Sequence, residues 1–204
     1  MEALVVDPAA RAGLSIGSRP EPVPGRSQLV LEVAAFSLVD RDLRYAPGML
    51  GPGEVWGFDA AGVVAVAAAD GSGPPAGTHV VTVLPAPGAW ARRIAVDSAD
   101  VAILPDGVDA GTATALALPG ISALQAVGVF GTLLGRRLLV TGASGAVGWY
   151  AVQLATRAGA HVVAAVRNHA DSDALAEIGA AEIVTDLGQV SPPVDGVLDV
   201  VGGP

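Results

Sequence analysis

The sequence predicts an α/β protein with two domains, a β-rich N-terminal domain and a C-terminal domain built on a doubly wound parallel sheet. The N-terminal half contains many short apolar segments separated by turns rich in glycine and proline, which indicates a small β-barrel or sandwich. From about Asp109 onward, segments of helix length alternate with buried-type strands, which is the pattern of a doubly wound sheet. We therefore predict two domains, residues 1–112 and 113–204.

The composition is that of a folded protein and excludes several function classes. Hydrophobic residues make up 51% of the 204 residues and charged residues 15%, which excludes a disordered chain. The net charge of −9 argues against nucleic acid or an anionic membrane surface as a partner. The chain has no cysteine, so disulfides, thiol nucleophiles and thiolate zinc sites are excluded.

The order of the expected elements follows the apolar segments and the turns between them. In the N-terminal domain we expect strands at 1–7, 14–16, 28–35, 79–84, 89–96 and 101–104, and one ending near residue 68. In the C-terminal domain we expect strands at 138–140, 159–166, 182–184 and 197–201, and helices at 149–155 and 173–178.

The segment from Gly111 to Gly135 carries no charge and superficially suggests a membrane span. Because Pro119 and Gly120 interrupt it, we expect two core helices separated by a turn instead. The N-terminus has no basic region before an apolar core, so we predict no signal peptide, no membrane partner and a cytoplasmic location.

The strand expected at 138–140 leads into a turn of small residues and then into a helix. Ala143, Gly145 and Gly148 in this turn follow the A-x-G-x-x-G form of the dinucleotide-binding fingerprint. A helix N-terminus at this point offers free amides and a partial positive charge to a pyrophosphate. The residues we expect to contact the pyrophosphate are Thr141, Ser144, Gly145, Ala146 and Val147. A glycine-rich turn of another kind of α/β protein is the alternative.

The residue after the next strand bears on the choice of cofactor. An NAD site usually places an acid there, about twenty residues past the turn, to accept from the ribose 2′-hydroxyl. This chain has Arg167, and a guanidinium suits a 2′-phosphate, so the sequence favours NADP. An ordinary solvated charge at a strand end is the alternative. Asp199, at the end of the last expected strand, is expected to order the local backbone.

Several stretches together resemble the zinc-independent medium-chain dehydrogenase/reductases, of the quinone oxidoreductase and enoyl reductase type. They are residues 36–42, 57–62, 119–124, 137–148 and 194–203, and the resemblance runs from Met1 to Pro204. It implies a chaperonin-10-like β domain followed by a Rossmann domain. It also implies NADPH as cofactor and hydride transfer to a quinone or an α,β-unsaturated carbonyl.

The resemblance extends to further residues of the cofactor site. It places Gly120 and Ile121, at the start of the connecting helix, on the nicotinamide side, and it makes Gly202 and Gly203 close over the cofactor. We expect no metal, because the cysteine ligand of the zinc-dependent relatives is absent and Phe58 stands where they have a histidine.

The chain departs from these relatives at the substrate side. Val39 stands where zinc-free relatives often have an asparagine, and Leu50 stands near the position of a tyrosine in several of them. Asp42 is expected to brace the backbone. Tyr45 is the nearest phenol that could donate a proton, although a packing role is an equal alternative.

The family's chains continue past the loop at residues 202–203 with two further strands, so we expect a Rossmann domain that is incomplete at its C-terminus. A homodimer is expected if those strands are supplied. The first hypothesis is an NADPH-dependent reductase of quinones or enones. The alternatives are an inactive or fragmentary nucleotide-binding protein, and an enoyl reductase acting on a carrier-bound acyl chain.

Overall fold

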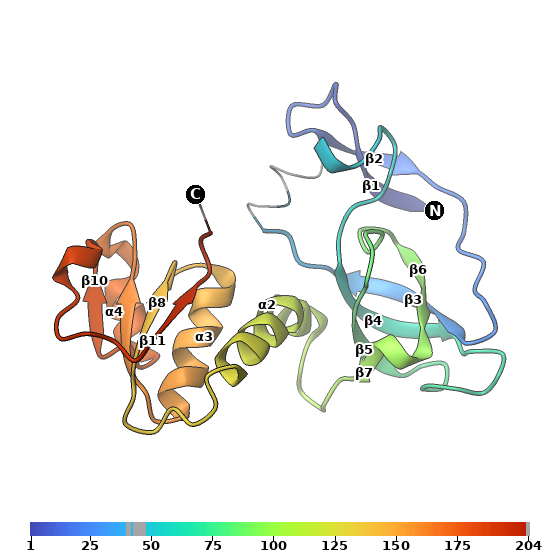
Figure 1. The fold of residues 1–204 in the computed structure, drawn as a ribbon. Helices are drawn as coiled ribbons and strands as arrows, with labels where there is room; N and C mark the ends of the chain where they lie inside the picture. Colours follow the sequence, from blue (N-terminus) through green and yellow to red (C-terminus); the bar gives the residue numbers. More distant parts are fainter. Residues whose placement is uncertain (40–41, 43–47, 203–204) are drawn as a thin grey trace. The chain divides into compact units, whose positions relative to one another are not determined.

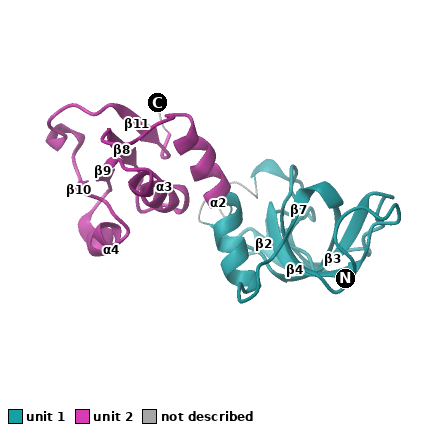
Figure 2. Cartoon of the chain, turned by 90° about the horizontal axis from the view of Figure 1, so that it is seen from below, with its two compact units in different colours: residues 1–118 teal, residues 119–204 magenta. Residues whose placement is uncertain are grey.

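The computed structural model describes all residues except 40–41, 43–47 and 203–204 (Figure 1). It divides into two compact units, residues 1–118 and 119–204, which are coloured separately in Figure 2. The predicted fold class is confirmed, because an antiparallel β unit precedes a unit with a parallel sheet and helices. The division falls inside a helix, and the predicted boundary between residues 112 and 113 stays a prediction. Tyr45 and Gly203 lie outside the described residues.

The N-terminal unit is built from short antiparallel strands. Their bounds are β1 (Glu2–Val6), β2 (Leu14–Ser18), β3 (Gln28–Ala35), β4 (Asp59–Val66), β5 (His79–Val83), β6 (Arg93–Asp97) and β7 (Val101–Ile103). Five of them form one sheet in the order β6-β3-β4-β5-β7, and β1 pairs with β2. Isolated bridges Ala3–Ala91 and Val5–Val55 join this hairpin to the rest of the unit. The predicted strands are therefore present, with shifted ends.

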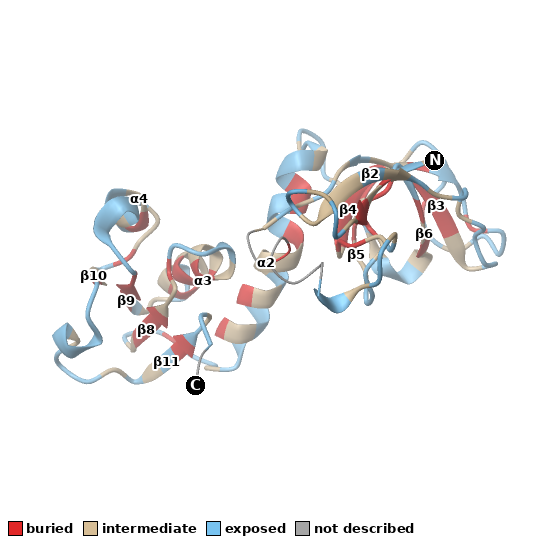
Figure 3. Cartoon of the chain, turned by 90° about the horizontal axis from the view of Figure 1, so that it is seen from above, coloured by how far each residue is buried: buried red, intermediate tan, exposed pale blue. Residues whose placement is uncertain are grey.

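The core of this unit comes from the inward-facing positions of the strands, coloured red in Figure 3. Leu29 and Leu31 of β3 are fully buried, as is Trp90 in the loop before β6. Gly62 of β4 lies where β3 and β4 approach most closely, since a Cβ there would lie 2.0 Å from the carbonyl oxygen of Glu32. This position therefore requires glycine, next to the register shifts between the two strands.

The uncharged segment forms one continuous helix up to residue 128, α2 (Ala110–Gly128), with Pro119 inside it. The expected turn at Pro119–Gly120 is therefore wrong. Proline removes one backbone donor and usually kinks or ends a helix, but here the helix continues past it to Gly128. By length and composition, α2 could cross a membrane, which is weak evidence because core helices of soluble proteins pass the same test.

The C-terminal unit is a four-stranded parallel sheet in the order β10-β9-β8-β11. The elements are β8 (Arg137–Thr141), α3 (Ala146–Arg157), β9 (His161–Ala165), α4 (Ser172–Glu177), β10 (Glu182–Val184) and β11 (Gly196–Asp199). Short 3₁₀ turns at His169–Asp171 and Leu187–Gln189 follow β9 and β10. The main expected elements of this domain are all present.

Both faces of this sheet are apolar, which explains why its strands are uninterrupted runs of Val, Leu and Ala. Leu138, Val140 and Val162 are buried in one cluster with residues of α3. Leu139 and Val163 belong to a second, smaller cluster that also contains Val184 and packs against residues after β10.

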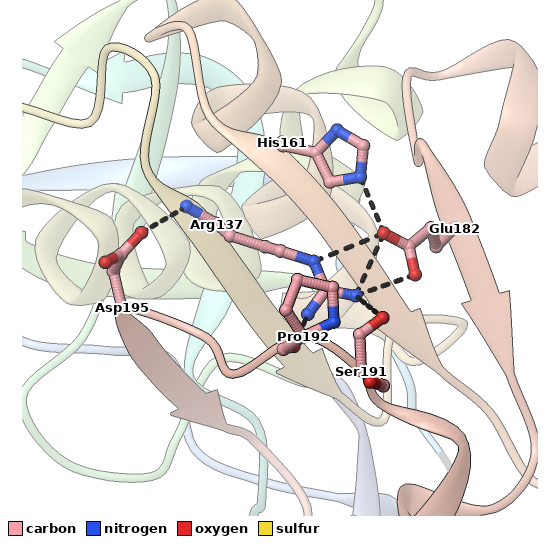
Figure 4. Close-up of polar contacts among 6 residues, drawn as sticks. All are labelled: Arg137, His161, Glu182, Ser191, Pro192 and Asp195. Carbon is pink, nitrogen blue, oxygen red and sulfur yellow. Dashed lines mark hydrogen bonds and ion pairs between the residues drawn. The ribbon is translucent and has the colours of Figure 1, made fainter.

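At the amino ends of the strands, Arg137 is the centre of a polar cluster shown in Figure 4. Its guanidinium donates two hydrogen bonds from Nη2 to the Glu182 carboxylate, at 2.9 and 2.7 Å, and its Nη1 donates to the carbonyl of Pro192. His161 also lies against Glu182, with Nε2 2.7 Å from Oε1. The backbone amide of Arg137 donates to Asp195 at 2.7 Å. The cluster ties β8, β9 and β10 to the segment that leads into β11.

We expect Glu182→Gln to lower the thermal stability of the protein at neutral pH. The pKa of Glu182 is held below its ordinary value, first by the hydrogen bonds from Arg137 and then by that from His161. A carboxyl group whose pKa is lower in the folded state stabilises the fold at any pH above its unfolded-state pKa. This stabilisation is lost as the pH falls through the folded-state pKa. The melting temperature of Glu182→Gln should thus lie below that of the unmodified protein at pH 7 and converge with it in acid.

Glu177→Gln is the matched control, because Glu177 is an exposed acid at the end of α4 in the same unit. An equal loss of melting temperature for both variants at pH 7 would contradict the role given to the Arg137 cluster.

Candidate functional site

The connectivity of the C-terminal unit defines a topological switch point between β8 and β11. From β8 the chain runs through α3 to β9 and through α4 to β10 on one side, and then crosses to β11 on the other side of β8. In open α/β sheets, ligands bind outside the carboxyl ends of the strands at such a point. The carboxyl ends of β8 and β11 are Thr141 and Asp199, which are directly paired.

The glycine turn after β8 is held by backbone hydrogen bonds. Gly142 has a φ of +61°, a conformation that favours glycine. The amide of Ala143 donates to the carbonyl of Ala165 at the end of β9, at 3.2 Å, and the amide of Gly145 donates to that of Gly142, at 2.9 Å. These backbone hydrogen bonds fix the turn to the end of β9 and close it on itself.

Gly148 lets the first turn of α3 pack directly on the glycine turn. A Cβ at this position would lie 2.3 Å from the carbonyl oxygen of Gly142 and 2.8 Å from the Cα of Ala143. Both neighbours are backbone atoms, so neither can rotate away. The last glycine of the fingerprint thus has the close-packing role that the motif assigns to it.

The predicted pyrophosphate residues lie together around this turn. Ser144, Gly145 and Ala146 are exposed, and Val147 is half-buried. Gly145 is the N-cap of α3 and makes no side-chain cap, so the first amides of the helix remain for an anion. The arrangement can hold a phosphate with backbone donors and the helix dipole. The individual phosphate contacts stay predictions.

Thr141 has a partner that the sequence did not reveal. Its hydroxyl donates to Oδ1 of Asp199, and the same oxygen accepts from the amide of Val201 at 3.1 Å. Hydrogen bonds, first from Thr141 and then from Val201, hold the pKa of Asp199 below its ordinary value. The hydroxyl proton of Thr141 is therefore directed to Asp199 in this structure. The expectation that Asp199 orders local backbone is confirmed, and its pairing with Thr141 is new.

Arg167 is the second residue after β9 and is exposed at the carboxyl edge of the sheet. It makes no hydrogen bond or ion pair with any other described residue. The following residues are held locally, since the side chain of Asn168 accepts from the amide of Ala170 at 2.9 Å, and His169 Nδ1 lies 3.1 Å from Ser172 Oγ. The guanidinium is thus available to a ligand phosphate.

The two remaining predicted glycines differ in setting. Gly202 is exposed, three residues past the end of β11, with a φ of +68° that favours glycine. Gly120, with Ile121, was expected at the start of a helix, but both lie in the interior of α2 because that helix is continuous. Their contact with a nicotinamide stays a prediction.

In the N-terminal unit, two carboxylates support the segment before residue 40. Asp59, which is 1% exposed, accepts from the amide and the hydroxyl of Ser37 at 2.7 and 2.5 Å. Burial raises the pKa of Asp59, against the hydrogen bonds from Ser37 and together with the charge of Asp42. Asp42 accepts from Trp56 Nε1 and from the amide of Val39, both at 3.1 Å, which confirms its expected bracing role.

Phe58 and Leu50, two positions at which the resemblance expects other residues, are apolar packing positions. Phe58 packs edge-on against Trp56, with ring centroids 5.3 Å apart, and Leu50 packs against the core of the N-terminal unit. Among the described residues, no three His, Asp or Glu side chains gather as they would around a metal ion. The absence of a metal stays a prediction.

Comparison with known proteins finds relatives that include proteins named as oxidoreductases, although no family model matches this chain. It is 32% identical over 206 residues to the synaptic vesicle membrane protein VAT-1 homolog of Mus musculus, covering 93% of this chain and 50% of that protein. It is 36% identical over 167 residues to a chloroplast envelope quinone oxidoreductase homolog of Arabidopsis thaliana, covering 75% of this chain and 51% of that protein. A trans-enoyl reductase of Aspergillus flavipes is 30% identical, and the match covers 85% of this chain and 59% of that protein.

Solved structures share the fold. The quinone oxidoreductase from Coxiella burnetii superposes with a TM-score of 0.92 at 24% identity, covering 100% of this chain and 69% of that one. A mycobacterial protein complexed with NADPH superposes with a TM-score of 0.80 at 25% identity, and the match covers 90% of this chain and 58% of that one. The chain spans about half the length of the curated relatives it matches.

We expect Gly148→Ala to destabilise the protein by about 1–3 kcal/mol, the usual cost of forcing an extra carbon into a packed site. The cause is the approach of the new Cβ to the Gly142 carbonyl, which also shapes the glycine turn. Urea unfolding followed by circular dichroism measures the change.

Gly128→Ala is the control, because no atom lies within 4 Å of a Cβ at this helical position. It should leave stability equal or slightly increased. A loss for Gly148→Ala no larger than that for Gly128→Ala would show that the helix does not need this close approach.

Proposed function

Because this chain is a relative of the quinone oxidoreductases and enoyl reductases of the medium-chain dehydrogenase/reductase family, we propose that it is an NADPH-dependent reductase. Its substrate would be a quinone or an α,β-unsaturated carbonyl. The observation that carries the proposal is the glycine turn at the switch point, with the exposed N-terminus of α3 beside it. The names of the quinone oxidoreductase and trans-enoyl reductase relatives support the reaction class.

Arg167 supports NADPH over NADH. A dinucleotide whose pyrophosphate lies at the N-terminus of α3 has its adenosine ribose near the end of β9. The guanidinium of Arg167 is exposed there without a partner among the described residues, and Arg167 stands where an NAD site has an acid. The solved relative in complex with NADPH supports the same choice.

The residues of this chain would contribute binding and orientation. The first amides of α3 would offset the charge of the pyrophosphate. Gly145 has no side chain to block its approach to the backbone, and Gly148 lets α3 pack closely on the glycine turn. NADPH supplies the hydride when it is bound, and the protein gains rate by aligning the reactants and excluding water. A reaction of this kind is compatible with Val39, Phe58 and Leu50 at apolar positions on the substrate side.

Two alternatives keep the same cofactor site. An inactive nucleotide-binding protein is favoured by the apolar residues Val39 and Leu50 where relatives have polar groups, and an enoyl reductase acting on a carrier-bound acyl chain is favoured by the trans-enoyl reductase relative. The proposal also includes a cytoplasmic location, no bound metal, and a homodimer if further strands complete the sheet.

We expect the protein to bind NADPH more tightly than NADH, and Arg167→Ala to weaken NADPH about tenfold or more while changing NADH little. The reason is the loss of a charge-assisted hydrogen bond to the 2′-phosphate. Titration with nucleotide fluorescence measures both constants. Arg157→Ala is the charge-matched control, because Arg157 is exposed at the opposite end of α3. An equal loss of affinity for NADPH and for NADH in Arg167→Ala would refute the role of Arg167.

We expect the protein to oxidise NADPH in the presence of a simple quinone or enone, followed at the absorbance of the reduced nicotinamide. A rate equal to the blank, despite tight NADPH binding, would favour the inactive binder. A rate seen with a carrier-bound enoyl thioester and absent with the free enone would favour the carrier-dependent reductase.

A further inference from the structure

We propose that Asp199 is a positioning residue for the dinucleotide, which fixes the crevice between β8 and β11 by holding Thr141 and the amide of Val201. The inference rests on the proposed function, since it concerns the crevice in which the cofactor would bind. Asp199 itself is not assigned a contact with the cofactor.

The position of Asp199 follows from the register of the sheet. Asp199 is the last residue of β11 and is paired with Thr141, the last residue of β8. These two strands flank the switch point, because the chain leaves β8 toward β9 and returns on the other side as β11. The Thr141–Asp199 contact therefore joins the two walls of the crevice at the level where a ligand would lie.

One carboxylate oxygen of Asp199 accepts hydrogen bonds from both sides of the crevice. Oδ1 of Asp199 accepts from the Thr141 hydroxyl on β8 and, at 3.1 Å, from the Val201 amide in the segment after β11. Hydrogen bonds to an ionised acceptor are roughly twice as strong as those between neutral groups. The carboxylate thereby fixes the direction in which the chain leaves β11.

That direction matters because the segment packs on the glycine turn. A Cβ on Gly142 would lie 2.7 Å from Cγ2 of Val201 and 3.2 Å from Cγ2 of Val200. Asp199 therefore restrains the glycine turn in two ways. It holds Thr141, which directly precedes Gly142, and it holds Val201, whose side chain packs on Gly142. Loss of the carboxylate would loosen the turn that presents the first amides of α3.

The test measures binding of NADPH and of adenosine 2′-monophosphate, a fragment that has the 2′-phosphate but neither phosphate of the pyrophosphate and no nicotinamide, by calorimetry. We expect Asp199→Ala and Thr141→Val each to weaken the binding of NADPH about tenfold, and to weaken that of adenosine 2′-monophosphate less than about twofold. Asp199→Asn and Thr141→Ser should stay within about threefold, because an amide oxygen still accepts and a serine hydroxyl still donates. The double variant should be little weaker than either single variant, since both act through one contact.

Asp186→Ala is the matched control. Asp186 follows β10 and likewise accepts from a backbone amide two residues on, that of Gly188 at 2.9 Å. It comes after the edge strand on the far side of β9, away from the switch point. It should leave both affinities unchanged.

Hydrogen exchange of the ligand-free protein separates the two proposals. Asp199→Ala should speed exchange at Val201 and at residues 142–145, and leave the amides of β9 unchanged. Unchanged exchange there, unchanged NADPH affinity, or equal weakening of NADPH and adenosine 2′-monophosphate binding would each overturn the role of Asp199. Failure of the unmodified protein to bind NADPH would overturn the proposed function, and exchange would then decide by itself whether Asp199 fixes the crevice.

Discussion

The carboxyl edge of the C-terminal unit depends on one close approach, that of α3 to the end of β8. Glycine at position 148 leaves room for the carbonyl of Gly142, which also accepts from the amide of Gly145. With a side chain at position 148, the helix would have to move outward and its first amides would move with it. Burial of Ala151, Val152 and Ala155 against the sheet holds the helix in this place. The glycine turn and the apolar face of α3 are therefore one structural unit.

The two edges of the same sheet differ in what holds them. At the amino edge, a guanidinium, a carboxylate and an imidazole join three strands through side-chain contacts centred on Arg137. At the carboxyl edge, the turn is held by backbone hydrogen bonds and by the pair Thr141–Asp199. Backbone contacts leave the exposed surface of the turn clear of bulky side chains. An anion can approach such a surface closely, which is what a dinucleotide site needs.

The N-terminal unit has its buried charges in a different place. Asp59 and Asp42 accept from backbone and side-chain donors of Ser37, Val39 and Trp56, so they are structural acceptors in the described part of the chain. Desolvation of Asp59 is partly compensated by the bonds from Ser37. Both carboxylates therefore stabilise the local backbone and the Trp56 side chain in the part of this unit that the structure describes. Phe58 and Leu50 pack against the apolar core of the same unit.

The sequence by itself determined the β-α-β unit, its glycine fingerprint, the exposed Arg167 after β9 and the β-rich character of the first half. These features are local, since each depends on residue types within one turn, strand or helix. It did not determine that α2 continues through Pro119, because packing decides whether a helix tolerates a missing donor. Only the tertiary structure brought together Thr141 with Asp199 and Arg137 with Glu182, which are 58 and 45 residues apart. Such pairs depend on strand order and register, and a crossover connection of this length does not specify either from its own residues.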